Sequence, residues 1–187
     1  TGVYNVFNKV LNPTDRTYNK YYPRGKDFFN IGVNYQFFWK RFTFLGETAL
    51  DKQGRIATMN MLRYSPKGSF QLVVMNRFYD VAYQSMYANS IGESSSVQNE
   101  SGFYIGLETN ILRYFKLNAY GDFFYFPWKK YQVSKNGTHG FDGVFQLSFS
   151  PRYELDMFIR YRYKNKYKDF TPEEGEKITI PYIQQKW

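Results

Sequence analysis

Few residue types in this chain could carry out covalent or metal chemistry. The 187 residues include no cysteine and one histidine, His139, so thiolate chemistry is excluded and a zinc or iron site would lack its usual ligands. His139 lies in a glycine-containing segment that we expect to be an external loop, and the nearest serines, Ser134 and Ser148, are not spaced to reach its ring. Acidic residues are scattered singly, without the spacing of a calcium loop or a catalytic carboxylate pair. We therefore predict no catalytic residue, no metal site and no cofactor.

Basic side chains are the main chemical feature of the composition. Lys and Arg number 25 against 16 Asp and Glu, a formal net charge of +9, which favours an anionic partner such as nucleic acid or a membrane surface. We expect the excess in the long connections and at strand ends on one side of the fold, as a basic rim of Lys20, Arg24, Lys26, Lys129, Lys130, Lys135, Lys164, Lys166 and Lys168. Contact with anionic lipopolysaccharide is favoured over capture of nucleic acid, because no recognisable nucleic-acid fold accompanies the charge.

Alternating apolar and polar residues predict the strands that must position these groups. Successive side chains of a strand point to opposite faces, and in residues 102–111 (GFYIGLETNI) Phe103, Ile105 and Leu107 share the apolar face. The same two-faced pattern predicts strands at 29–39, 115–125, 141–149 and 153–163. Extended segments with apolar residues on both faces lie at 42–50, 55–64, 69–78 and 177–187, and residues 2–10 would make a tenth strand.

Short and long connections alternate along nearly the whole chain. Short ones are expected near Lys40, at 65–68, near Arg113 and at 150–152. Between them lie connections at 11–27, 51–54, 79–101, 126–140 and 166–176, all of which except 51–54 are long. In a meander this places short turns at one end and long loops at the other, as in outer-membrane barrels, and the strands match the ~9–11 tilted residues that cross a bilayer. The sequence therefore predicts a single all-β domain over residues 1–187, an antiparallel up-and-down transmembrane β-barrel of about ten strands or part of a larger barrel. Because the chain begins at Thr1 and not at Met, we treat it as a possible fragment.

The polar faces of these strands would line the inside of such a barrel. The expected inward set is Glu47, Arg77, Glu108, Lys116, Asp122, Asp142, Glu154, Asp156, Arg160 and Arg162. These side chains could line a polar conduit and set its ionic preference. Alternatively, they could neutralise each other across a plugged lumen and hold neighbouring strands in register. The nearly balanced signs favour the second interpretation.

A soluble β-sandwich or small barrel with a shared aromatic core would also show a period of two. Its outer face would usually carry Lys, Glu and Thr, whereas the polar faces here hold many Gly, Asn, Gln, Ser and Tyr. Aromatic residues near strand ends, such as Trp39 and Trp128, also suit the headgroup zone of a bilayer. In the less favoured interpretation, the chain is a soluble β-sheet protein that binds a polyanion or a carbohydrate through basic, aromatic loops.

Three stretches resemble the barrel region of large outer-membrane proteins of Bacteroidota. They are 46–54 (GETALDKQG), 98–106 (QNESGFYIG) and 120–128 (YGDFFYFPW). Those proteins are often labelled for a helix-hairpin-helix, competence-protein-like segment ahead of the barrel, which this sequence does not contain. The resemblance extends over residues 28–165 and implies an integral outer-membrane barrel without supplying any catalytic residue.

Together, these patterns predict an integral protein of the bacterial outer membrane that acts as a non-catalytic channel, an assembly component or a surface scaffold. Its expected partners are outer-membrane lipid and lipopolysaccharide, with other envelope proteins or missing barrel strands as further candidates. Nucleic acid is not expected as a partner.

Overall fold

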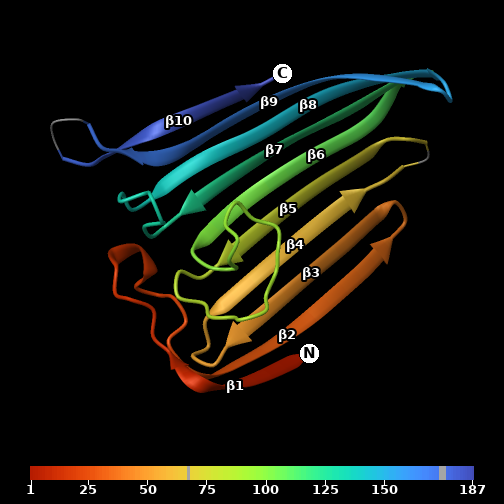
Figure 1. The fold of residues 1–187 in the computed structure, drawn as a ribbon. Helices are drawn as coiled ribbons and strands as arrows, with labels where there is room; N and C mark the ends of the chain where they lie inside the picture. Colours follow the sequence, from red (N-terminus) through yellow and green to blue (C-terminus); the bar gives the residue numbers. More distant parts are fainter. Residues whose placement is uncertain (67, 173–175) are drawn as a thin grey trace.

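The computed structural model describes residues 1–66, 68–172 and 176–187, which form one sheet of ten antiparallel strands (Figure 1). Every strand pairs with the next along the chain, which confirms the predicted all-β, up-and-down fold. None of the described segments is a helix long and apolar enough to cross a membrane. The strands are β1 (Gly2–Leu11), β2 (Gly25–Trp39), β3 (Phe42–Asp51), β4 (Ile56–Tyr64), β5 (Gln71–Tyr79), β6 (Glu100–Leu112), β7 (Phe115–Phe126), β8 (Thr138–Arg152), β9 (Leu155–Phe170) and β10 (Ile178–Lys186), and a short 3-10 helix spans Thr17–Asn19.

Strand β9 continues beyond its predicted end at residue 163. The added part pairs with β10 without a register shift, beginning with Phe170 opposite Ile178. Lysines at 164, 166 and 168 alternate with Asn165, Tyr167 and Asp169, so the period of two continues past the predicted end of the strand. Lys166 and Lys168 therefore lie within the sheet, which corrects their expected place in a connection at 166–176.

Connections of unequal length lie at the two ends of the sheet (Figure 1). The β2–β3, β4–β5, β6–β7 and β8–β9 connections are short and lie at one end, whereas residues 12–24, 80–99 and 127–137 form long connections at the other. This confirms the predicted alternation, with the short β3–β4 connection at residues 52–55 as the expected exception at the long-loop end. Residues 80–99, here called the covering loop, fold over the hollow of the curved sheet. We call the face beneath this loop the loop face and the opposite one the outer face.

The sheet is open at both sides. Among the described residues, β1 pairs only with β2 and β10 pairs only with β9. Pro181 lies on the edge strand β10, where the missing backbone donor is tolerated. The strands described here form a curved sheet whose two edges are unpaired.

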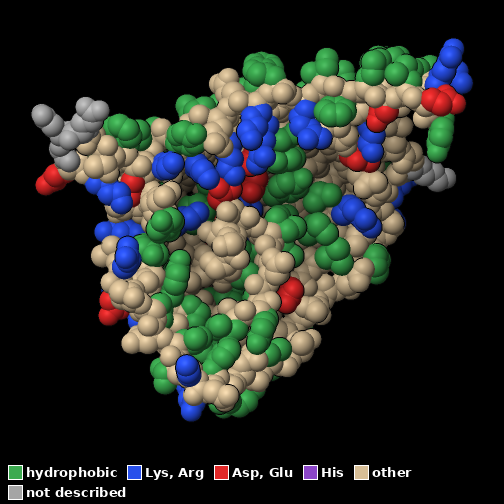
Figure 2. Space-filling model, in the orientation of Figure 1, with side chains coloured by type: hydrophobic (Ala, Val, Ile, Leu, Met, Phe, Trp, Pro, Cys, Tyr) green, Lys and Arg blue, Asp and Glu red, His purple; other side chains and the backbone are tan. Residues whose placement is uncertain are grey.

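The two faces of the sheet differ in composition. The outer face exposes large apolar side chains on every strand from β2 to β9, among them Ile31, Val33, Phe37, Phe44, Leu62, Phe78, Phe103, Ile105, Phe123, Phe145, Met157 and Ile159. On the loop face, in contrast, the charged side chains of Arg77, Glu100 and Asp142 are buried. Figure 2, which looks onto the loop face, shows basic and acidic side chains gathered over the upper strands, where Figure 1 places β7 to β9.

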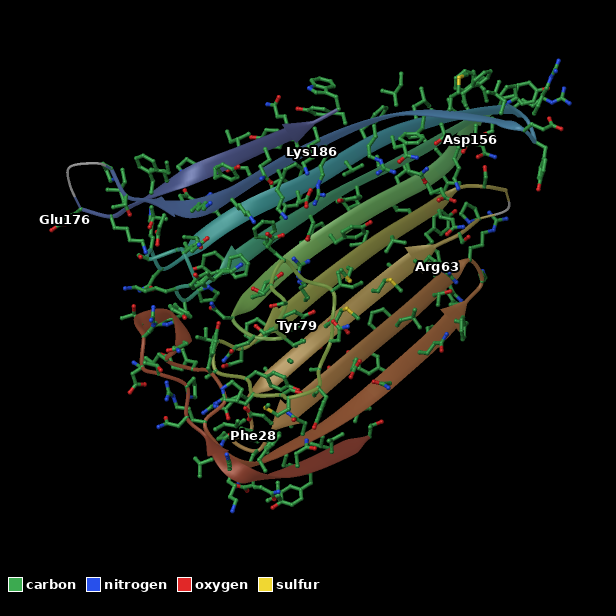
Figure 3. All side chains as sticks on the ribbon, viewed as in Figure 1. Phe28, Arg63, Tyr79, Asp156, Glu176 and Lys186 are labelled. Atoms are coloured by element: carbon green, nitrogen blue, oxygen red, sulfur yellow. The ribbon has the colours of Figure 1, made fainter. Side chains whose placement is uncertain are left out.

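The covering loop packs on the loop face of β3 to β5. Tyr79 and Tyr83 form a buried cluster with Ala57, against which Ala49 and Val97 pack. Tyr79 lies beneath the loop in Figure 3. This packing explains why β3 to β5 carry apolar residues on both faces: one set lies on the outer face and the other lies under the loop.

A small polar cluster interrupts the outer face at β2 to β4. Tyr35 Oη donates a hydrogen bond to Asn60 Oδ1 at 2.5 Å and lies 3.2 Å from Thr48 Oγ1. The Thr48 hydroxyl in turn lies 2.8 Å from that of Thr58. The Tyr35 ring lies against Gly46, where any side chain would overlap it. These polar groups bond to one another, so they need no water to satisfy them.

Replacing Asn60 by alanine should lower the free energy of unfolding by about 1 kcal/mol, because the Tyr35 hydroxyl loses its acceptor. The matched control is Asn76→Ala, since Asn76 lies directly opposite Asn60 on the next strand and outside the cluster. Denaturant unfolding followed by tryptophan fluorescence measures both variants. Equal destabilisation by the two substitutions would contradict a role for this hydrogen-bonded cluster.

Candidate functional site

A buried ionic cluster on the loop face joins β5, β6 and β7. Arg77 Nε donates to Glu100 Oε1 at 2.8 Å, and Arg77 Nη1 donates to Asp122 Oδ1 at 2.7 Å. Arg77 Nη2 also donates to Asp122 Oδ2 at 3.1 Å, so this pair is bidentate. Arg77 and Glu100 are 0% exposed. Two carboxylates therefore share one guanidinium group: Glu100 is fully buried, and Asp122 is 16% exposed.

The sequence leaves room for this cluster at Gly102. The β5–β6 register places Arg77 opposite Gly102, and a Cβ atom at that position would overlap the guanidinium group. Glycine thus permits the arginine side chain to lie flat across β6. The glycine on the polar face of GFYIGLETNI therefore marks a packed charged side chain and not an open lumen.

Glu100 also holds the covering loop. Its carboxylate accepts hydrogen bonds from the backbone N–H groups of Glu93 at 2.9 Å and Ser94 at 3.0 Å. Further along the loop, Asn30 Nδ2 on β2 donates to the Gln84 carbonyl oxygen at 2.8 Å. The loop is therefore attached to β2 at one point and to β6 at another, and this keeps it in the hollow of the sheet.

Strand β9 presents basic side chains to the loop face at every second position. In the β8–β9 register, Lys164 lies opposite Asp142, whereas the alternate residue Ile159 lies opposite Leu147 on the outer face. Figure 2 shows basic side chains gathered in this region. The basic row, as we call it, consists of Arg160, Arg162, Lys164, Lys166 and Lys168.

Two carboxylates are shared along the basic row. Arg162 Nε donates to Asp142 Oδ1 at 2.9 Å, and Lys164 Nζ lies 3.3 Å from Asp142 Oδ2. Glu93 of the covering loop lies 2.6 Å from Lys164 Nζ and 3.4 Å from Lys166 Nζ. Each acid therefore serves two cations, and the row keeps a positive excess.

The two ends of the basic row have no carboxylate partner in the described part of the chain. Arg160 Nε donates to Gln146 Oε1, a neutral acceptor, at 2.7 Å. Lys168 Nζ lies 5.7 Å from the centre of the Tyr182 ring on β10. Weak or neutral partners leave most of the positive charge of these two residues uncompensated.

Lys130, in the connection between β7 and β8, lies close to the basic row. Its Nζ is 3.4 Å from the centre of the Phe126 ring, a cation–π contact. Burial lowers the pKa of Lys130 to about 8, because the charged ammonium loses hydration, while Glu93 acts in the opposite direction. The neighbouring ammonium groups of Lys164 and Lys166 lower this pKa further.

The other residues predicted to face inward are more exposed. Glu108 on β6 and Lys116 on β7 form an ion pair at 2.9 Å. Glu47 lies on β3, and Asp156 lies near the β8–β9 turn (Figure 3). Glu154 falls in that turn, because β9 begins only at Leu155, and this corrects its predicted place on a strand face.

The remaining rim residues lie in different surroundings. Lys20 and Lys135 each place Nζ 5.5 Å from the centre of an aromatic ring. Arg24 pairs with an exposed aspartate at 2.7 Å. Lys26 lies within β2, and Lys129 lies in the connection between β7 and β8. The structure therefore divides the predicted rim into loop residues and residues of the sheet.

His139 lies in β8 and not in the external loop expected for it. Its ring packs edge-on against Tyr167, with 5.6 Å between ring centres. Within the described ranges, no three His, Asp or Glu side chains are arranged as a metal site.

Two important acids, Glu93 and Glu100, are absent from the predicted set. The available signal for Glu100 was its even position in the same alternating strand as Gly102 and Tyr104. Glu93 lies in a loop without periodicity, so only the fold shows that it contacts Lys164.

Replacing Arg77 by methionine should lower the free energy of unfolding by about 3–5 kcal/mol, because the buried Glu100 and the partly buried Asp122 lose their counter-charge. The control is Arg63→Met on β4, an exposed arginine near the short-turn end (Figure 3). We expect that control to shift stability by less than about 0.5 kcal/mol. Denaturant titration of both variants measures the difference, and a similar small effect for both would contradict the cluster's structural role.

The amine of Lys130 should titrate with a midpoint of about 8 in the folded protein. Reductive methylation with ¹³C-formaldehyde followed by NMR at increasing pH measures this midpoint. The assigned signal should vanish in Lys130→Arg and remain in Lys129→Arg. A midpoint near the ordinary lysine value of about 10.4 would contradict the burial of this ammonium.

Comparisons of this chain with protein-family models, curated proteins and solved structures give no match. The function is therefore inferred from the placement of the chain's own residues.

Proposed function

We propose that this chain forms part of the wall of a transmembrane β-barrel in a bacterial outer membrane, with its outer face in lipid. The loop face would line a narrow, non-catalytic conduit. The observation that carries this proposal is the contrast between the apolar outer face, exposed from β2 to β9, and the charged loop face.

The apolar outer face is too extensive for a surface in water. Contiguous exposed apolar patches on soluble monomers rarely exceed a few hundred Å². A soluble sandwich would cover such a face with a second sheet, but the described residues form one sheet only. Lipid tails would instead satisfy the whole face at once, which supports the membrane assignment over the soluble alternative.

Aromatic rings at the short-turn end support the same orientation. Phe42 stacks between Trp39 and Tyr64, with ring centres 6.0 Å and 4.7 Å apart. Phe115 and Phe149 form a similar contact at 4.7 Å between β7 and β8. Such rows are typical of the aromatic girdles that lie at the headgroup level of outer-membrane barrels.

The loop face suits an interior that is polar and partly filled. The Arg77 cluster is closed by its own ion pairs, and the covering loop occupies part of the hollow. Free edges at β1 and β10 would each leave backbone groups unsatisfied in lipid, at a cost of several kcal/mol per group. The proposal therefore includes further strands, from the same protein or from a partner, that pair with both edges.

Single-cysteine spin labels should test which face meets lipid, and the chain has no native cysteine to interfere. In vesicles, labels at Phe103→Cys and Ile105→Cys should be more accessible to oxygen, which dissolves in lipid tails. Labels at Tyr104→Cys and Glu108→Cys should be more accessible to a water-soluble nickel chelate.

The reverse pattern in these labels would refute the assignment of the two faces. If the protein fails to enter vesicles and stays in the aqueous fraction, the membrane proposal is overturned. The soluble protein that binds a polyanion or carbohydrate would then be the better interpretation.

A further inference from the structure

A groove of about 470 Å³ lies on the loop face over β5 to β9. Neither Arg77, Glu100 nor Asp122 lines it, so it is separate from the buried ionic cluster. A volume of this size falls in the range of small-molecule sites. The polar and charged side chains that line it include Tyr104, Glu108, Asn118, Tyr120, Arg160 and Arg162.

The charged groups of the groove leave one cation uncompensated. Glu108 pairs with Lys116 at 2.9 Å, and Arg162 pairs with Asp142. Arg160 bonds only to the neutral Gln146 through Nε, and within the described residues no carboxylate lies at ion-pair distance from it. The terminal nitrogens of Arg160 can therefore serve as donors to an anion that enters the groove.

Two stacked tyrosines form another side of the groove. The rings of Tyr104 and Tyr120 lie 5.6 Å apart at an interplanar angle of 28°. Both side chains are half-buried, so their rings present a firm apolar surface beside polar groups. A flat ring in a ligand could pack against this surface while its charged group contacts Arg160.

We infer that this groove binds small organic anions in which a carboxylate or phosphate is attached to a ring. Arg160 contacts the anionic group, and Tyr104 and Tyr120 contact the ring. The inference rests on the proposed function, since it names the class of solute that the conduit would accept. The excess positive charge of the basic row draws such anions along β9 toward the groove.

Calorimetric titration with phenyl phosphate tests the inference on the full chain refolded in detergent micelles. The wild type should show saturable binding, and Arg160→Gln should weaken it about tenfold, as expected for the loss of one hydrogen bond to a charged group. Arg63→Gln, a loop-face arginine outside the groove, should bind as the wild type does. Arg160→Lys, which keeps the charge but not the two-pronged donor, should fall between them.

The contribution of the ring is measured separately. Inorganic phosphate should bind more weakly than phenyl phosphate to the wild type, and Tyr104→Leu should reduce that difference while phosphate affinity stays the same. No saturable binding of phenyl phosphate, or equal loss in Arg160→Gln and Arg63→Gln, would overturn the inference.

The binding test and the spin-label test have separate readouts. If the spin labels support the membrane assignment and phenyl phosphate does not bind, only the groove inference fails. If phenyl phosphate binds as expected and the protein stays in the aqueous fraction, the groove is retained and the proposed function fails.

Discussion

The arrangement of the loop face depends on the ion pairs of Arg77 with Glu100 and Asp122. The Arg77 guanidinium group balances half of the charge of these two carboxylates, which lie on two neighbouring strands. Because Glu100 also accepts two backbone N–H groups of the covering loop, the position of that loop depends on the same cluster. A single side chain therefore couples strand pairing, charge balance and the filling of the hollow. Loss of Arg77 would leave both carboxylates without their counter-charge, whereas loss of either acid would leave Arg77 paired with the other.

The acidic and basic side chains of the loop face are not evenly distributed over the strands. By composition, the inward acids and bases nearly cancel, which suggested a neutral, plugged interior. In the structure, Arg77 is surrounded by acids at β5 to β7, whereas β9 carries a row of bases with fewer acids to share. The loop face is therefore acidic at the buried cluster and basic along β9. Such an uneven distribution of charge exerts an electric field on a mobile ion, even where the acids and bases nearly cancel in number.

The strands could be predicted from sequence because their signal is local. Alternation of residue types along 102–111 specifies both an extended backbone and the face that each side chain occupies. The extension of β9 to Phe170 also alternates, with lysines at 164, 166 and 168, but both of its faces carry polar residues, so the contrast between an apolar and a polar face is absent there. The same limit applies to the site. The sequence predicts that Arg77 faces inward, but it does not reveal that Arg77 pairs with Glu100 or that Glu100 accepts a hydrogen bond from the backbone of Glu93 in the covering loop. Contacts between residues far apart in the chain depend on the folded backbone, and residue types alone do not reveal them.

Pro181 has a consequence for how the free edge of β10 can pair with other chains. Pairing with β9 continues through Pro181 without a shift, so the missing donor interrupts the outward row of backbone groups. A regular stack of copies, as in amyloid-like fibrils, requires an unbroken ladder of donors and acceptors. One imino acid on the outermost strand thus hinders uncontrolled aggregation while leaving shorter stretches on either side able to dock a complementary strand.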